Sequence, residues 1–263
     1  MVNVLFIGDI NGRPGRDAVE QFLPSLIKEK QIDFVIANGE NSAAGFGITP
    51  DVFKKLIAMG IDVITTGNHI WDKRDIIPLM DMEPALLRPY NLPPGNPGTG
   101  CGVFECKRND KKVKIGVISM IGRVFMQPTD CPFRAAEAAL SEIKKETRIA
   151  IIDIHAEATS EKQALAFFLD GRASAVLGTH THVQTADERI LAYGTGFITD
   201  AGMTGSMDSV IGVKKEIIIE KFLTGMPARF EIAETDVHFN GVFLSIDETN
   251  GKTTLIERID LKK

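Results

Sequence analysis

The stretch VNVLFIGDIN, residues 2–11, joins an apolar run typical of a buried β-strand to residues of metal-binding type. Asp9 follows the run directly, so its carboxylate is expected at the carboxyl end of a strand, where ligands bind in open α/β sheets. The same order of an apolar run and then Asp, Glu, Asn or His recurs at NGEN (38–41), GNH (67–69), His155 and GTHTH (178–182). We therefore expect parallel strands that bring oxygen and nitrogen ligands to one edge.

Histidine is concentrated in these clusters. The chain of 263 residues contains five histidines, and four of them belong to the clusters, whereas His238 in TDVHFN has no such context. Imidazole and hard oxygen atoms without thiolate argue against copper(I) and structural zinc sites. The concentration predicts a metal-dependent hydrolase.

The glycines around Asp9 suggest a second interpretation of the first cluster. Gly8, Gly12 and Gly15 resemble a dinucleotide-binding loop, but their spacing is GxxxGxxG rather than GxGxxG. Asp9 would also place a negative charge where a pyrophosphate has to lie. A metal ligand is the favoured role for Asp9, and a helix or turn cap is the structural alternative.

The second and third clusters combine a carboxylate, two amides and a histidine. Glu40 has two oxygen atoms and can bridge two cations, whereas Asn41 and Asn68 each offer one neutral amide oxygen. His69 can donate a proton near neutral pH. Ordinary hydrogen-bonded turns, Asn-Gly in the one case and Asn-His in the other, are the alternatives.

The last two clusters carry the remaining histidines. His155 ends the apolar run RIAIIDI, where an unpaired ring would be costly to bury, so it is either a ligand or a satisfied core residue. In an extended segment His180 and His182 would face the same side, because side chains repeat every second residue. Two imidazoles on one face predict a metal clamp, and a solvent-facing pair is the alternative.

The composition limits the partners of the chain. Apolar residues make up 44%, charged residues 25%, and the formal net charge is −5. This charge argues against a stable nucleic-acid partner or an anionic membrane, which both favour basic proteins. No apolar run approaches the roughly 18 residues that span a bilayer. Three cysteines cannot all pair, and residues 2–7 are too short for a signal-peptide core, so we expect free thiols and a cytoplasmic location.

Strands and helices alternate through the first two-thirds of the chain. We expect helices near 17–30 (kinked or broken at Pro24), from Pro50 to Gly60 with Thr49 as N-cap, at 73–82, at 134–146, and from a Thr159 or Ser160 cap to 169. Two strands at 102–106 and 112–120 are expected to form a hairpin at Asn109-Asp110. Residues 228–234, 241–248 and 253–259 have the alternation of antiparallel strands. The prediction is one α/β domain over residues 1–263 with mixed sheets.

In order and spacing, D…E…GNH…H…GxHxH resembles the calcineurin-like metallophosphoesterase superfamily. The likeness narrows to the bacterial YmdB-like phosphodiesterases through GDINGRPGR (8–16), NGENSAAGFGIT (38–49), TTGNHIWDK (65–73), DIHAEATSEK (153–162), GTHTHVQTAD (178–187) and TDAGMTGSMDSVIG (199–212). The resemblance runs over the whole chain. It implies a four-layer αββα sandwich of two mixed β-sheets flanked by helices.

The resemblance also implies a set of ligands for two divalent metal ions, iron or manganese in its place. One ion would be held by Asp9, Glu40, Asn41 and His182, and the other by Glu40, Asn68, His155 and His180. Glu40 would bridge the two ions, and His69 would be the catalytic proton donor. Three positions depart from the wider superfamily, with Asn11 in place of the histidine of D-x-H, Glu40 in place of a bridging aspartate, and Ile70 in place of an acidic residue.

The activity expected from this resemblance is hydrolysis of phosphodiester bonds, with 2′,3′- or 3′,5′-cyclic nucleotides as substrates and a homodimer or homotetramer as the assembly. A phosphomonoesterase or nucleotidase with the same metals is the first alternative. A regulatory protein that binds metal or nucleotide with little turnover is the second. Arg13 and Arg16 could contact a phosphate, and Phe46 and Trp71 could stack on a base, although solvated arginines and packed rings are the commoner case.

Overall fold

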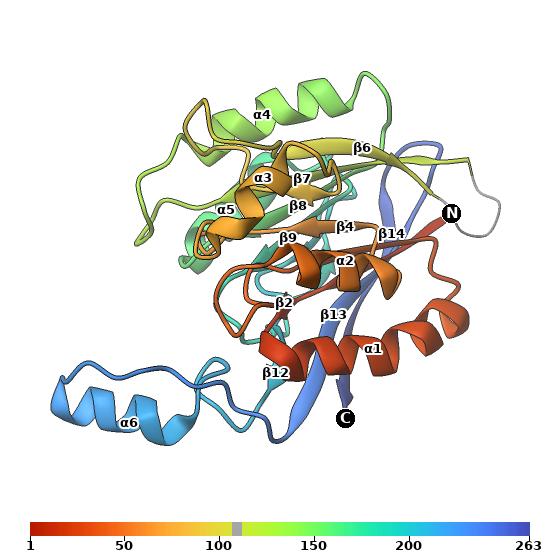
Figure 1. The fold of residues 1–263 in the computed structure, drawn as a ribbon. Helices are drawn as coiled ribbons and strands as arrows, with labels where there is room; N and C mark the ends of the chain where they lie inside the picture. Colours follow the sequence, from red (N-terminus) through yellow and green to blue (C-terminus); the bar gives the residue numbers. More distant parts are fainter. Residues whose placement is uncertain (107–111) are drawn as a thin grey trace.

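The first of two mixed β-sheets contains eight strands. The computed structural model describes residues 1–106 and 112–263 (Figure 1). The strand order is β2-β12-β13-β1-β3-β4-β5, with β14 also paired to β13. The bounds are β1 Val2–Ile7, β2 Asp9–Ile10, β3 Phe34–Asn38, β4 Val63–Thr65, β5 Leu86–Leu87, β12 Met203–Ser206, β13 Val237–Ile246 and β14 Thr253–Lys262. Strands β1, β3, β4 and β5 are parallel, and β13 is antiparallel to β1.

The second sheet contains six strands in the order β10-β11-β9-β8-β7-β6. Its bounds are β6 Cys101–Glu105, β7 Lys114–Ile121, β8 Ala150–His155, β9 Ala175–Thr179, β10 Arg189–Ile190 and β11 Gly196–Ile198. Strands β7, β8, β9 and β11 are parallel, whereas β6 and β10 are antiparallel edge strands.

Helices cover the outer face of each sheet, which completes four layers. Their bounds are α1 Gly12–Glu29, α2 Pro50–Ala58, α3 Ile77–Met80 preceded by the 3₁₀ helix η1 Arg74–Ile76, α4 Pro132–Ile143, α5 Thr159–Phe168 and α6 Lys215–Thr224. Figure 1 shows α1 and α4 on opposite outer sides. One buried cluster lies between the sheets and joins Val4 and Phe6 to Val117 and Ile151, and two others lie under the helices. The predicted fold class is confirmed.

The parallel strands bring the predicted clusters to one edge. In the first sheet Ile7 pairs with Ala37 and Asn38 pairs with Thr65, so β1, β3 and β4 end together. In the second sheet His155 pairs with Thr179 at the ends of β8 and β9. The Nδ2 atom of Asn38 donates a hydrogen bond of 3.0 Å to Asp153, which joins the two groups of strand ends across the sandwich.

Helix α1 differs from its prediction at its start. It begins at Gly12, five residues earlier than expected, and it continues through Pro24 to Glu29, so the predicted kink or break is not a break. The start is early because Pro14 and Gly15 fit the first turn, where Gly15 approaches the carbonyl of Thr204 so closely that a Cβ would lie 2.2 Å from its oxygen. Pro24 is tolerated because the buried stripe of Ala18, Val19, Leu23 and Leu26 holds the helix against the sheet.

Other local predictions have mixed outcomes. Thr49 accepts a hydrogen bond of 3.4 Å from Val52 N and Pro50 opens α2, as predicted. The predicted cap of α5 is wrong, because Ala158 is the N-cap and no side chain caps the helix. Residues 228–234 do not form a strand and contribute only an isolated bridge between Val213 and Ile232. Strands β6 and β7 pair as expected, but their connection at Asn109-Asp110 lies outside the described residues.

The structure offers no candidate for a membrane-spanning helix. In the described part of the chain, no helix is both long enough and apolar enough to cross a bilayer.

Pro24 provides a test of how α1 is stabilised. Pro24→Ala should raise the free energy of unfolding by about 1–3 kcal/mol, because proline inside a helix costs about 3 kcal/mol, partly offset by the stiffer unfolded chain. Urea denaturation measures the change. Pro50→Ala is the matched control, since at the start of α2 the missing N–H costs nothing, and it should give no gain. An unchanged or lower stability for Pro24→Ala would contradict the explanation.

Candidate metal centre

Four predicted metal ligands meet around one nitrogen atom of His155. The Nε2 atom lies 2.8 Å from Glu40 Oε1, 3.0 Å from Asn68 Oδ1 and 2.9 Å from His180 Nδ1. An imidazole nitrogen carries at most one hydrogen, so it cannot satisfy three such neighbours at once. Ligand atoms of Glu40, His155 and His180 lie within 4.8 Å of one another, a separation that suits binding to a common ion.

The remaining predicted ligands form a second group beside the first. His182 Nε2 lies 3.1 Å from the Asn41 amide and 3.9 Å from Asp9 Oδ1. Asp9 Oδ1 is also 3.9 Å from His155 Nδ1, and Asp9 Oδ2 accepts a hydrogen bond of 3.1 Å from the backbone N–H of His180. The structure thus brings all seven predicted ligands together.

Hydrogen bonds fix the ring orientation of His155 and His182, one histidine from each group. The Thr179 hydroxyl donates to Asp153 Oδ1 at 2.7 Å, so its oxygen can accept from His155 Nδ1 at 2.9 Å. His182 Nδ1 lies 3.0 Å from the carbonyl oxygen of Ile211, which can only accept. Both rings therefore carry a proton on Nδ1, and Nε2 is the nitrogen of each ring that faces the ligand group.

Asp153 anchors this arrangement inside the sandwich. It is buried and accepts hydrogen bonds from Thr179, from Thr65 Oγ1 at 2.5 Å and from Asn38 Nδ2 at 3.0 Å. Burial raises the pKa of Asp153 to about 6, against the opposing effects of His155 and of these hydroxyl groups. Near neutral pH it is therefore mostly a carboxylate that orients His155 through Thr179.

The buried charges of the centre are unevenly balanced. Burial favours the neutral form of Glu40, but the contact with His155 outweighs it and lowers the pKa of Glu40 to about 2. Burial disfavours a charged His155, yet Glu40 and Asp9 raise its pKa to about 9. Burial and the charge of His155 lower the pKa of His180 to about 3. Burial raises the pKa of Asp9 even though His182 and His155 oppose it.

The GTHTH segment is extended only as far as Thr179, where β9 ends, so the period-two argument does not apply to its two histidines. His180 and His182 have φ values of 98° and 66°, in the left-handed region that costs a non-glycine residue about 1 kcal/mol or more. Thr181 between them is held by Asp200, which accepts from its backbone N–H at 3.0 Å and its hydroxyl at 2.6 Å. Lys162, with no exposed surface, pairs with the same carboxylate at 2.8 Å. Both rings still reach the ligand group because this buried ion pair fixes the loop.

The donor set fits divalent cations on two independent observations. Among the side chains that the structure describes, three buried oxygen atoms have no hydrogen-bond partner, and they are Asp9 Oδ1, Glu40 Oε1 and Asn11 Oδ1. Buried oxygens without partners are costly unless a ligand satisfies them. The cavity beside them has a volume of about 300 Å³, and none of the described residues that line it is Lys or Arg. Cations would supply the positive charge that these carboxylates lack.

His69 lies in the wall of this cavity, at the edge of the ligand group. Its backbone N–H donates to Glu40 Oε2 at 3.0 Å, and its Nδ1 lies 2.8 Å from Asp72 Oδ2. The carboxylate of Asp72 therefore holds Nδ1, and Nε2 is the ring nitrogen left for proton transfer.

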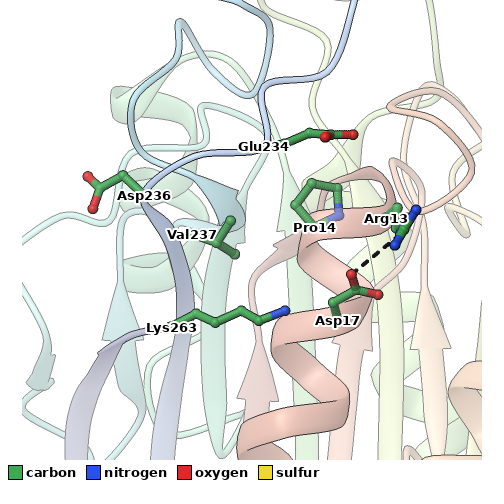
Figure 2. A pocket seen from close by; sticks show the side chains of 7 residues that line it. All are labelled: Arg13, Pro14, Asp17, Glu234, Asp236, Val237 and Lys263. Atoms are coloured by element: carbon green, nitrogen blue, oxygen red, sulfur yellow. Dashed lines mark ion pairs between the residues drawn. The ribbon is translucent and has the colours of Figure 1, made fainter.

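Neither arginine that was considered for phosphate binding lines this cavity. Arg13 pairs with Asp17 at 3.5 Å and lines a separate cavity of about 340 Å³ with Lys263 (Figure 2). Arg16 donates instead to the carbonyl of Ser42 and so supports the loop of residues 39–49. His238 is partly exposed, contacts Asp260 at 2.6 Å and is not among the described residues that line this cavity.

Three further residues at the centre are not among the predicted ligands or the predicted proton donor. Asn11 lines the cavity with a partnerless oxygen, although the sequence marks it only as a departure from a motif. Asp72 contacts His69 from three residues away, where the superfamily pattern places its acid next to the histidine. Phe230 lines the cavity from a segment that resembles an edge strand in sequence.

The fold and the donors together define the class. A sandwich of two mixed sheets with carboxylates, amides and histidines at the parallel strand ends is the architecture of a family of phosphatases and phosphodiesterases. The chain belongs to the YmdB-like protein family, whose model matches residues 5–259.

Two relatives illustrate the family. The chain is 48% identical over 258 residues to a 2′,3′-cyclic-nucleotide 2′-phosphodiesterase of Bacillus subtilis, covering 98% of this chain and 96% of that protein. It is 35% identical over 265 residues to a putative phosphatase/phosphodiesterase of Mycoplasma pneumoniae, covering 98% and 92%.

Solved structures show the same architecture. A hypothetical protein from Thermus thermophilus has a TM-score of 0.92 at 40% identity, with 100% of both chains covered. A phosphatase from Mycoplasma pneumoniae has a TM-score of 0.92 at 34% identity, covering 99% of this chain and 93% of that one. A 5′-nucleotidase from Candida albicans shares the fold at a TM-score of 0.54 and 13% identity, covering 99% and 51%.

Gly67 tests whether the position of His155 governs metal binding. A Cβ at residue 67 would lie 2.2 Å from His155 Cδ2 and 2.5 Å from its Nε2, so Gly67→Ala has to displace the ring. Metal content measured by elemental analysis should fall, with a loss of about 10- to 100-fold in metal affinity. Thr66→Ser is the matched control, because it retains the hydroxyl that donates to Leu87 O at 2.8 Å. Full metal content in folded Gly67→Ala would refute the role.

Proposed function

We propose that this chain is a phosphodiesterase that uses two divalent metal ions and hydrolyses cyclic nucleotides, 2′,3′-cyclic nucleotides first and 3′,5′-cyclic nucleotides second. The crowding of Glu40, Asn68 and His180 around His155 Nε2 is the observation that carries the proposal. The name of the relative at 48% identity supports this substrate class.

We propose that the ligands divide into two sets. Asn68, His155 and His180 would hold one ion, and Asp9, Asn41 and His182 would hold the other. Glu40 is the candidate bridge, because one of its oxygens faces His155 and has no hydrogen-bond partner. Nitrogen and hard oxygen donors without thiolate suit iron or manganese.

The charge of the site supports the same chemistry. Two bound divalent ions would polarise the phosphate and lower the pKa of the attacking water. The described cavity residues include no Lys or Arg, so this chain offers an anionic diester little other positive charge there. Its own residues contribute ligand atoms, an enclosed position for the phosphate and a proton donor.

His69 is proposed as that donor. With Nδ1 held 2.8 Å from Asp72, the ring can carry a proton on Nε2 toward the oxygen of the leaving group. Asp72 fixes the orientation of the ring. The contact of Asp72 with His69 takes the place of the acidic residue that the superfamily has at the position of Ile70. The backbone bond from His69 to Glu40 keeps the donor beside the ligand group.

The setting of the enzyme is part of the proposal. We propose that residues 1–263 act as one domain in the cytoplasm and assemble as a homodimer or homotetramer. Three cysteines cannot all pair with one another, which favours a reducing compartment. The formal net charge of −5 disfavours a stable nucleic-acid partner.

A substrate panel tests the proposed function. Protein loaded with iron or manganese should turn over 2′,3′-cyclic AMP and bis-p-nitrophenyl phosphate much faster than p-nitrophenyl phosphate, and chelation should abolish turnover. Faster hydrolysis of the monoester would favour a phosphomonoesterase or nucleotidase. Tight nucleotide binding without product, at full metal content, would favour a regulatory binder.

The role of His69 is tested by the leaving group. His69→Ala should lower kcat about 10²- to 10⁴-fold on 2′,3′-cyclic AMP, whose alkoxide needs a proton, and far less on bis-p-nitrophenyl phosphate. Metal content should stay unchanged. His238→Ala removes a histidine with a similar carboxylate contact outside the site and should leave both rates unchanged. Equal losses on the two substrates would exclude proton donation by His69.

A further inference from the structure

The cavity at the metal centre has a second, apolar side. Its polar side includes Glu40, Asn41, His69, His180 and His182, and its apolar side includes Phe46, Ile211, Val213, Phe230 and Ile232. The apolar side chains are thus within one cavity of about 300 Å³ with the candidate ligands. A substrate whose phosphate lies at the ligands will place one of its ester groups against this wall.

Most of the apolar wall comes from a segment that leaves the sandwich. We call residues 207–236 the arm, which follows β12, carries α6 and returns to β13. Figure 1 shows α6 projecting away from the sheets. The base of the arm is fixed by the bridge between Val213 and Ile232, by Lys214 N donating to Glu231 O at 2.9 Å, and by Ala233 N donating to Gly212 O at 3.0 Å.

Where it joins the sandwich, the arm packs closely against the loop of residues 39–49, between β3 and α2. Gly45 has a φ of 88°, and a Cβ there would lie 2.4 Å from Ile232 Cδ1. Phe46 follows in the loop, and its ring lies nearly parallel to that of Phe230, at 24° with centroids 6.4 Å apart. The edge-to-face contact of Phe46 with His69, at 5.1 Å, continues this aromatic wall to the candidate proton donor.

The apolar character of this wall favours one kind of ester group on the substrate. Phe46 and Phe230 are each partly exposed, so their rings are accessible from the cavity. A hydrated glycerol or sugar group would lose water there without gaining hydrogen bonds. A planar heteroaromatic ring instead gains contact area and stacking, and it needs no hydrogen bonds from the wall.

We propose that Phe46 and Phe230 form a subsite for the nucleobase, so that the arm sets the preference of the enzyme for nucleoside diesters. The inference rests on the proposed function and extends it, because it identifies the group that the cavity recognises beside the phosphate. Phe230 acts here as a specificity residue and takes no part in the bond-breaking step.

The test compares a diester that carries a base with one that lacks it. Phe230→Ala and Phe46→Ala should each lower kcat/KM for 2′,3′-cyclic AMP by about 5- to 150-fold, mainly through KM. For glycerol 1,2-cyclic phosphate, which has the same five-membered ring and no base, the change should stay within about twofold, because uniform binding to the base is absent. Phe230→Trp should retain the preference for the nucleotide.

Phe222→Ala is the matched control. Phe222 belongs to the same arm, is 83% exposed and does not line the cavity, so its loss should leave both substrates unaffected. Equal losses of kcat/KM on both diesters in Phe230→Ala would show that the arm supports the metal centre and does not bind the nucleobase. Unchanged kinetics on both would also overturn the subsite.

Binding separates this inference from the proposed function. If the metal-loaded protein hydrolyses neither diester, the proposed function fails. The subsite then still predicts that adenosine 3′-monophosphate binds more tightly than glycerol phosphate in calorimetry. Phe230→Ala should weaken only the nucleotide, with circular dichroism and metal content unchanged. Equal affinity for the two ligands would overturn the subsite by itself.

Discussion

Two carboxylates without exposed surface, Asp9 and Glu40, set the main constraint on this structure. An uncompensated buried charge costs several kcal/mol, so each carboxylate needs a positive partner. Glu40 has one in His155, and its pKa is low for that reason. Asp9 lies 3.9 Å from both His155 and His182 and keeps an oxygen without a hydrogen bond, so burial dominates and raises its pKa. The centre is therefore organised for added positive charge, and Asp9 is the group that most needs it.

The sandwich meets this constraint by joining its two sheets where their parallel strands end. Asp153 from the second sheet accepts hydrogen bonds from Asn38 and Thr65 of the first, and it orients His155 through Thr179. The apolar interior holds the sheets together, and this polar network aligns their ends. The donors contributed by one sheet are thus kept in register with those of the other, as two groups of ligands require.

The sequence predicts those parts of the structure that depend on local pattern. Apolar runs followed by ligand residues predict the strand ends, and all seven candidate ligands meet there. The conformation of His180 and His182 is not predictable in this way, because Asp200 and Lys162, distant in sequence, impose left-handed backbone on the loop. The alternation of residues 228–234 indicates a strand, but these residues line a cavity and form only an isolated bridge.

One contact of the arm joins the two sides of the cavity directly. Ile211 at its base lines the apolar wall, and the carbonyl oxygen of the same residue accepts from His182 Nδ1 at 3.0 Å. Ile211 therefore both bounds the apolar side of the cavity and fixes which nitrogen of His182 faces the ligand group. In the proposed function, metal ligation would depend on the sheet ends, whereas selectivity would depend on the arm anchored beside them. This division separates the wall from the ligand set, and the hydrogen bond of His182 joins the two.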